Sequence, residues 1–188
     1  MKTRLLVVVA PILMAIACSP SPSVDPEWQA ELETWRTERE AGLAQPDSWL
    51  ALVGLHWLEP GDNAVGGVET ADVPLPSDAA PPEVATLTLT EDGVVTLAPA
   101  EGVALEVNGS PAAPGVLTTD AVGKPDILTL ERLRFYLIDR DGAIAVRVKD
   151  PKAPTQVSFD GLEWYDPNPD LRIEAAFEPY DEPKQISI

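Results

Sequence analysis

The spacing of hydrophobic residues changes at about residue 46. Before that point, large apolar residues recur at intervals close to those of one helix face. These residues are Trp28, Leu32, Trp35 and Leu43. Asp25 can cap the first turn, and Pro26 suits the first helical position. The pattern predicts one amphipathic N-terminal helix over residues 25–45, and we expect its aromatic stripe, Trp35 included, to pack into a core.

After residue 46 the chain reads as short apolar runs separated by turn-forming residues such as Asp92-Gly93 and Asn108-Gly109. The expected strands are 49–58, 63–68, 84–90, 94–98, 104–107, 127–130, 133–139, 143–148, 157–159 and 172–178. Many short strands without alternating helices are typical of a β-sandwich or barrel. We therefore expect a mainly β protein, a β-sandwich preceded by one helix.

The clearest hairpin joins the strands 133–139 and 143–148. Strict alternation places one set of its side chains on a buried face and the other on the opposite face. The first set is Leu133, Phe135 and Leu137, and the second is Arg134 and Tyr136. The turn lies within Asp139-Arg140-Asp141-Gly142.

The first 24 residues have the features of an export signal. Residues 1–17 combine a basic start with an apolar run too short to span a bilayer. Cys18 follows a small residue, and the stretch resembles a bacterial lipobox, with Ala15 where Leu is more usual. We expect cleavage before Cys18 and lipid attachment to its sulfur. Residues 18–24 then form a Pro/Ser tether. Asp is absent just after the cysteine, and the resemblance to the sorting rules of Gram-negative lipoproteins implies the outer membrane, facing the periplasm.

Charge limits the classes of partner. The chain has 13 Lys and Arg against 31 Asp and Glu, a formal net charge of −18. Nucleic-acid binding works by neutralising phosphates with basic residues, so we expect no DNA or RNA partner. A membrane would be reached only through the lipid anchor. The single cysteine excludes an internal disulfide.

The residues offer little catalytic chemistry. His56 is the only histidine, and a zinc site needs three or four nitrogen or sulfur ligands, so we expect no metal and no cofactor. A hydrolase triad would have His56 as its sole base, and no Gly-x-Ser-x-Gly elbow is present. The remaining polar candidates are Arg147, Lys149 and Asp150 at a strand end before a proline. They form either an anion-binding group or a salt-bridged strand terminus.

Several motifs taken together resemble the bacterial family catalogued as domain of unknown function 1684. They are Trp35-Arg36-x-x-Arg39, Trp49-Leu50-x-Leu52-x-Gly54-Leu55-x-Trp57-Leu58, Pro60-Gly61-Asp62-Asn63, Leu128-x-Leu130, Phe135-Tyr136, Ala145-Val146-Arg147-Val148-Lys149-Asp150-Pro151 and Phe159-x-Gly161-Leu162-x-Trp164-Tyr165. The resemblance implies an envelope lipoprotein without an established activity. Members of that family continue past this point, which implies a β-sandwich domain over residues 46–188 that is truncated at its C-terminus.

A second, weaker likeness is to a forkhead-associated β-sandwich. It rests on Asn63-x-x-Gly66, Val107-Asn108-Gly109 and Phe135-Tyr136. In that family an Arg follows the glycine, and a Ser and a His hold phosphothreonine. Here Gly67 takes the place of the Arg, and residues 80–83 supply neither Ser nor His. The resemblance therefore implies the sandwich without phosphopeptide binding.

Two functions fit these observations. The first is a lipid-anchored, non-catalytic binding or structural domain of the cell envelope, with a protein or small-molecule partner that the residues do not identify. The alternative is an envelope hydrolase whose active site is completed by a C-terminal part missing from this chain. A ligand-binding set of Arg147, Lys149 and Asp150 serves either function.

Overall fold

The computed structural model describes residues 24–179. They divide into two compact units: Trp35–Glu163, and the described residues of Met1–Thr34 and Trp164–Ile188. The expected signal peptide, Cys18 and most of the tether lie outside the described residues, as does the segment 180–188.

The N-terminal helix is present as α1 (Pro26–Leu43). It begins where the sequence predicts, because the Asp25 carboxylate accepts a hydrogen bond of 2.9 Å from the Glu27 N–H. None of its side chains is buried. Trp35 is 53% exposed, so the expectation that this ring lies in a core was wrong. No helix within residues 24–179 has the length and apolar character needed to cross a membrane.

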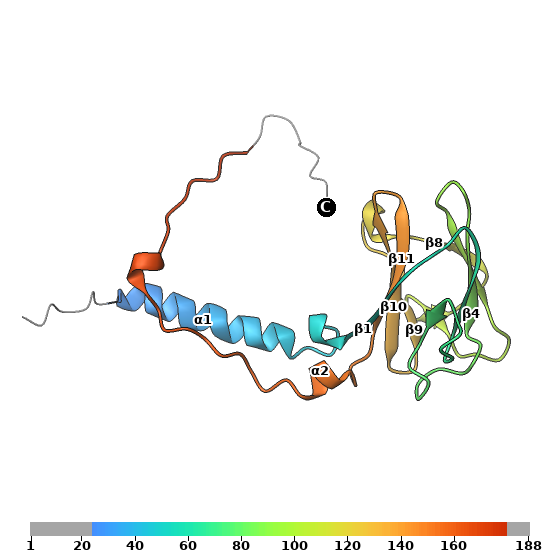
Figure 1. Ribbon diagram of the computed structural model, residues 1–188, viewed down its shortest axis with the longest axis horizontal. Helices are drawn as coiled ribbons and strands as arrows, with labels where there is room; N and C mark the ends of the chain where they lie inside the picture. The colour runs from blue at the N-terminus through green and yellow to red at the C-terminus, as the bar shows by residue number, and fades with distance from the viewer. Residues whose placement is uncertain (1–23, 180–188) are drawn as a thin grey trace, which may run out of the picture. The chain divides into compact units, whose positions relative to one another are not determined.

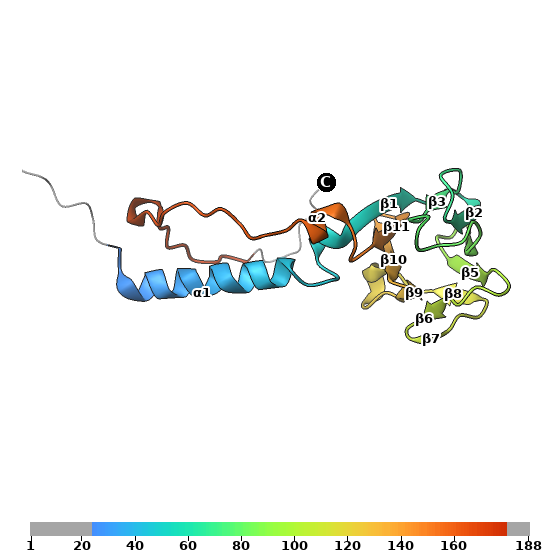
Figure 2. The same ribbon diagram turned by 90° about the horizontal axis from the view of Figure 1, so that it is seen from below.

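Two sheets form the body of the larger unit, and their strand pairs are antiparallel except for the parallel pair of β2 and β3. The six-stranded sheet comprises, in spatial order, β1 (Leu52–Trp57), β11 (Ala143–Lys149), β10 (Leu133–Arg140), β9 (Leu128–Leu130), β6 (Glu106–Val107) and β7 (Ser110–Pro111). The five-stranded sheet comprises β3 (Val73–Pro74), β2 (Gly61–Gly66), β4 (Ala85–Leu89), β5 (Val95–Pro99) and β8 (Gly115–Leu117). Figure 1 shows β10 and β11 side by side, and Figure 2 shows the two sheets from a second direction. The protein is mainly β, a β-sandwich with one N-terminal helix, as predicted.

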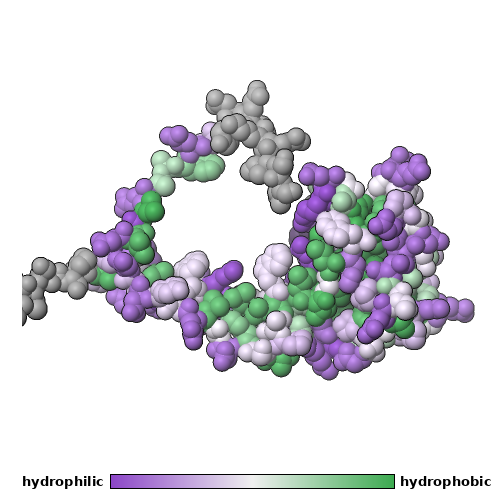
Figure 3. Space-filling model, viewed as in Figure 1, coloured by the Kyte–Doolittle hydropathy of each residue, from purple (hydrophilic) through white to green (hydrophobic). Residues whose placement is uncertain are grey.

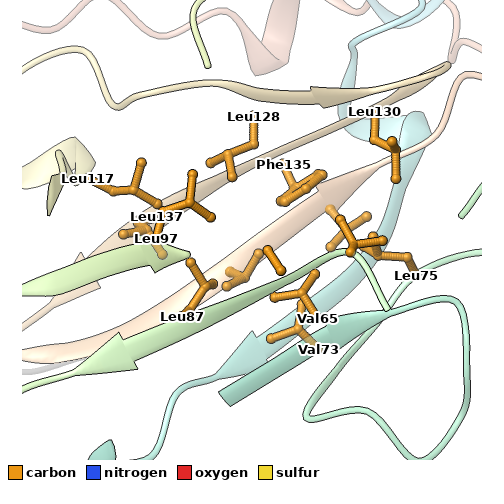
Figure 4. Packing of buried hydrophobic residues seen from close by; sticks show 14 of the residues in the cluster. Val65, Val73, Leu75, Leu87, Leu97, Leu117, Leu128, Leu130, Phe135 and Leu137 are labelled. Carbon is orange, nitrogen blue, oxygen red and sulfur yellow. The ribbon is translucent and has the colours of Figure 1, made fainter. Parts of the chain in front are cut away.

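The core lies between the two sheets. One wall is formed by inward side chains of β9, β10 and β11, and the other by those of β2, β4 and β5. Figure 4 shows Leu128, Phe135 and Leu137 facing Leu87 and Leu97 across this layer. Phe135 is completely buried, and burial of such side chains is the main stabilising contribution to a sandwich.

The β10–β11 hairpin follows from its turn residues. Arg140 pairs with Ala143, which leaves Asp141 and Gly142 as a two-residue loop. Both have positive φ, 55° and 88°, as a type I′ turn requires. The predicted alternation is confirmed: Leu133, Phe135 and Leu137 are buried.

Three strand predictions need correction. The run 49–58 begins as a 3₁₀ turn, η1 (Trp49–Ala51), and only then becomes β1. The expected strand 157–159 is instead the end of the short helix α2 (Pro154–Val157), because Pro154 fits a first helical turn and the Ser158 N–H bonds to its carbonyl at 3.0 Å. Residues 172–178 alternate in sequence but form no strand. A 3₁₀ turn, η3 (Pro169–Leu171), precedes them.

A buried asparagine fixes the crossing from one sheet to the other. Asn63 lies within β2 and is 2% exposed. Its side-chain oxygen accepts the Glu59 N–H at 2.9 Å, and its amide donates to the carbonyls of Glu59, Gly61 and Leu87 at 2.8, 3.0 and 3.2 Å. These bonds hold the turn between β1 and β2, and therefore fix where β1 ends.

Candidate functional site

The outer face of the six-stranded sheet carries the candidate site. Along β11, Val146 and Val148 point into the core, so Arg147 and Lys149 point away from it. The ladder to β10 places Arg147 opposite Tyr136 and Lys149 opposite Arg134. Two of the three ligand-binding residues expected from sequence are therefore brought together, with an aromatic ring between the strands.

Arg147 lies between two aromatic rings. Its guanidinium carbon is 5.0 Å from the centre of the Trp49 ring and 6.0 Å from that of Tyr136. One terminal nitrogen donates a long hydrogen bond of 3.5 Å to the Tyr136 hydroxyl, and the buried Nε has no partner in the part of the chain that the structure describes. Cation–π contacts of this kind hold a guanidinium in place without neutralising its charge.

Trp49 owes its position to the turn η1 and to α2. The Ser48 hydroxyl caps η1 by accepting the Leu50 N–H at 3.1 Å, and it donates to the Gln156 side chain at 2.9 Å. Thr155 donates to the Leu50 carbonyl at 2.6 Å. The short helix that replaces an expected strand therefore secures the ring that stacks on Arg147.

A surface hollow of about 590 Å³ opens beside this stack. It is called the cationic hollow below, and its lining residues are Asp47, Asp120, Pro125, Ile127, Arg134, Tyr136, Arg147 and Lys149. Lys149 donates to the Asp47 carbonyl, and the Arg134 guanidinium is 3.9 Å from the Asp47 carboxylate. Three basic side chains thus surround the hollow in a chain with a net charge of −18.

One carboxylate at the hollow is already neutralised. Asp120, in the 3₁₀ turn η2 (Asp120–Val122), forms a salt bridge of 3.0 Å with Arg140 and accepts the Asp139 N–H at 2.9 Å. Burial opposes its ionisation, but the hydrogen bonds from Arg140 and Asp139 outweigh burial and lower the pKa of Asp120. The nearby charge of Arg147 lowers it further.

Asp150 does not belong to this group. It is 4% exposed, and its carboxylate accepts two hydrogen bonds from Arg132, at 2.8 and 3.0 Å, and one from the Lys152 N–H at 2.8 Å. Burial opposes ionisation, but the Arg132 and Lys152 bonds outweigh it and lower the pKa of Asp150. Arg132 also pairs with Asp78 at 2.7 Å. Of the two sequence-based interpretations, Asp150 has the geometry of the salt-bridged strand terminus.

Beside the cationic hollow, β1 adds an exposed apolar strip. Val53, Leu55 and Trp57 are 40%, 43% and 50% exposed. Leu55 pairs with Arg147 and Trp57 with Ala145, so both lie on the same outer face. Figure 3 shows apolar residues, in green, gathered where Figure 1 draws β1. The face therefore combines aromatic, aliphatic and basic side chains.

His56 has a setting unlike that of a catalytic base. It pairs with Val146 in β1, and its ring lies over Gly54, where an added Cβ would come within 2.3 Å of Nε2. Burial lowers its pKa. No hydrogen bond to His56 occurs within residues 24–179, and no three metal-ligating side chains cluster in that range.

At Gly66 and Gly67, where the forkhead-associated resemblance lacks the expected Arg, the chain packs closely against the backbone of residues 80–82. The Gly67 N–H donates to the Pro81 carbonyl at 2.7 Å. A Cβ on Gly67 would lie 2.2 Å from the Ala80 carbonyl oxygen, and one on Gly66 would lie 1.9 Å from that of Pro82.

No protein-family model and no curated protein matches the chain. The resemblance to domain of unknown function 1684 therefore has no support from these comparisons and stays a prediction. Solved forkhead-associated (FHA) domains are similar to about half of the chain. The likeness is weak, with a TM-score of 0.35 in each of three examples, and it carries no argument about ligands.

The first of these is an FHA domain studied for phosphothreonine-dependent interactions, 18% identical, matched over 50% of this chain and 92% of that one. The second is the FhaA FHA domain in complex with the intracellular domain of Rv3910, also 18% identical, over 50% and 97%. The third is the FHA-2 domain of the Mycobacterium tuberculosis ABC transporter Rv1747, 25% identical, over 48% and 77%.

Sequence reasoning missed the aromatic and apolar parts of this face. Alternation placed Tyr136 outside the core, which was the available signal for it. The apolar run 49–58 predicts a strand at Trp49, although Ser48 caps a turn that begins there. The role of Arg134 depends on the register with Lys149, which no local pattern determines.

Proposed function

We propose that this protein is a non-catalytic, lipid-anchored binding domain of the cell envelope that presents the outer face of its six-stranded sheet to a polypeptide partner. The observation that carries the proposal is Arg147, a guanidinium held between Trp49 and Tyr136 with no carboxylate at ion-pair distance among residues 24–179. Aromatic residues and arginine are enriched at the centres of protein–protein interfaces.

The surrounding surface supports the same function. Trp49 is 63% exposed, and the apolar strip of β1 continues the patch across the sheet. Exposed apolar residues scattered singly need no explanation, but a contiguous set on one sheet face is typical of an interaction site. Its basic side chains make it electrostatically different from the rest of this acidic chain, which steers an acidic partner to it.

The hydrolase alternative has no comparable support. His56 is the sole histidine, and within the described residues no acid orients it and no hydroxyl is activated by it. An activated nucleophile needs a base within hydrogen-bond reach. A binding function needs no group beyond those on the outer face.

The membrane location rests on the first 18 residues. The leader 1–17, the cysteine that follows it and the Pro/Ser segment after it support attachment by acyl chains, which the resemblance to domain of unknown function 1684 also implies. Metabolic labelling with radioactive palmitate tests this part. We expect label on the full chain and none on a Cys18→Ala variant; an unlabelled full chain would refute the anchor.

Site-specific photo-crosslinking tests the binding face. A photoreactive phenylalanine analogue replaces Leu55 on the outer face or, as a control, Val116, which is 66% exposed on β8 of the other sheet. We expect discrete crosslinked protein species in native envelopes from position 55 only. Equal patterns from both positions, or none from position 55, would contradict the proposal.

A further inference from the structure

We propose that the cationic hollow binds a carboxylate attached to an apolar group, with Arg147 as its anchor. This inference rests on the proposed function and names the chemistry that the outer face recognises. The carboxylate belongs either to the C-terminal residue of a polypeptide or to a small free acid.

The charged groups at the hollow differ in the partners that they already have. Asp120 is neutralised by Arg140, at 3.0 Å. The Asp47 carboxylate lies 3.9 Å from Arg134, and Lys149 is held by the Asp47 carbonyl. Arg147 alone has neither a carboxylate nor a carbonyl partner in the described part of the chain.

The arginine is also arranged to bind. The rings of Trp49 and Tyr136 lie 5.0 and 6.0 Å from its guanidinium carbon, and its buried Nε makes no hydrogen bond within residues 24–179. Its only hydrogen bond there is the 3.5 Å contact to Tyr136, which is near the limit of such bonds. The terminal N–H groups are therefore available to a planar anion, and a carboxylate matches a guanidinium in shape.

Charge favours a monoanion over a phosphate. The Asp47 carboxylate lines the hollow and has only a long contact, 3.9 Å, with Arg134, so it would repel a dianion more strongly than a single charge. A carboxylate brings one negative charge, which Arg147 can balance.

The walls of the hollow indicate what carries the carboxylate. Pro125, Ile127 and the ring of Tyr136 line it together with the basic residues. An aliphatic or aromatic substituent buries its surface against these side chains, whereas a small hydrophilic acid would leave the side chains exposed to water. We therefore expect affinity to rise from acetate to acids with a large apolar group.

Titration with a matched pair of compounds tests the inference. The probes are N-acetylphenylalanine, its amide, acetate and inorganic phosphate, added to the full chain and followed by Trp fluorescence and calorimetry. We expect saturable binding of N-acetylphenylalanine and none of the amide, because the amide lacks the anion. Equal binding of acid and amide, or tighter binding of phosphate, would overturn the proposal.

Two variants separate the anchor from general charge. Arg147→Gln should weaken N-acetylphenylalanine about 10- to 100-fold, the effect of losing hydrogen bonds to a charged group. Arg39→Gln makes the same change on the exposed side of α1 and should leave binding unchanged. Arg147→Lys should not restore binding, because a lysine cannot form the bidentate contact.

Equal losses in Arg147→Gln and Arg39→Gln would refute the anchor role. Should Arg147→Gln fail to fold, Lys149→Gln removes another cation from the lining of the same hollow and should weaken the binding of N-acetylphenylalanine. Unchanged affinity in Lys149→Gln would then refute the site in this hollow.

A hexapeptide with an apolar C-terminal residue, free or amidated, distinguishes the two sources. Tighter binding of the free hexapeptide than of N-acetylphenylalanine identifies a chain terminus, and equal affinity identifies a small acid; either supports the inference. Failure of every acid with persistent crosslinking from position 55 would refute the carboxylate site and leave the proposed function standing. Loss of that crosslink with the acids still bound would refute the polypeptide partner instead.

Discussion

Asn63 offers the most direct test of how the two sheets are joined. Asn63→Ala removes the side-chain amide that bonds Glu59, Gly61 and Leu87. The exposed turn lets water replace the bonds to Glu59 and Gly61, so their net contribution is about 1 kcal/mol each. Leu87 stays paired in the sheet, but its carbonyl loses the buried amide donor of Asn63. We expect a decrease in the free energy of unfolding of about 2–4 kcal/mol.

The assay is equilibrium denaturation in urea, followed by Trp fluorescence and circular dichroism. Asp62→Ala is the matched control, because Asp62 is exposed and makes a single side-chain bond, 2.6 Å from the Thr88 hydroxyl. We expect it to cost less than about 1 kcal/mol. A loss for Asn63→Ala no greater than that of the control would refute the reasoning, because the turn would then hold without the amide.

Asn63→Asp refines the same test. The new side chain keeps the acceptor for Glu59 but turns a charged oxygen toward three carbonyls. Its folded-state pKa would be raised, so the penalty is present above the unfolded pKa and is relieved as the pH falls. We expect this variant to be less stable than Asn63→Ala at pH 7 and to recover on acidification. A loss independent of pH would show that the site is solvated.

Three further predictions follow from burial and close contact. Gly66→Ala should destabilise strongly in thermal unfolding, because its Cβ would meet the Pro82 carbonyl oxygen at 1.9 Å and only backbone could move; an unchanged melting temperature would refute the contact. Phe135→Ala should cost about 3–5 kcal/mol, and Trp35→Ala less, because the first ring is fully buried and the second half exposed; the reverse order in denaturation would contradict the core assignment. The lowered pKa of Asp150 means that its ionised form stabilises the fold above about pH 4 and that this contribution is lost as the pH falls, so Asp150→Asn should flatten the acid side of the stability–pH curve; an unaltered curve would show that the pair does not contribute.

The sandwich could be predicted because some of its strands, such as β4 and the first half of β10, alternate buried and outward positions and its turns carry positive-φ residues. In β10, Leu133, Phe135 and Leu137 alternate with polar neighbours, and Asp141-Gly142 fits the two-residue turn. Local pattern and tertiary packing agree there, so periodicity alone identifies the face. The strand at 172–178 failed despite similar alternation, because a strand also needs a neighbour to pair with, and none is present among the described residues.

The candidate site was predictable only in part, for a physical reason. Arg147 and Lys149 are two residues apart on one strand, so period two places them on one face. Asp150 is the next residue, so its side chain turns away from the face of Arg147 and Lys149, and it binds Arg132. Trp49 reaches Arg147 from a separate turn, through contacts between segments about 100 residues apart, and such contacts leave no local signature.

Strand β1 carries a consequence for the behaviour of the purified protein. It has no charged residue and no proline, and its only ladder partner in the described chain is β11. Such an open edge is a template for joining a second copy, strand to strand. With a net charge of −18, mutual repulsion keeps two copies apart in dilute buffer, and added salt screens that repulsion. Association of this protein should therefore increase as ionic strength rises. Light scattering should rise at a lower salt concentration in preparations without the partner than in preparations with it.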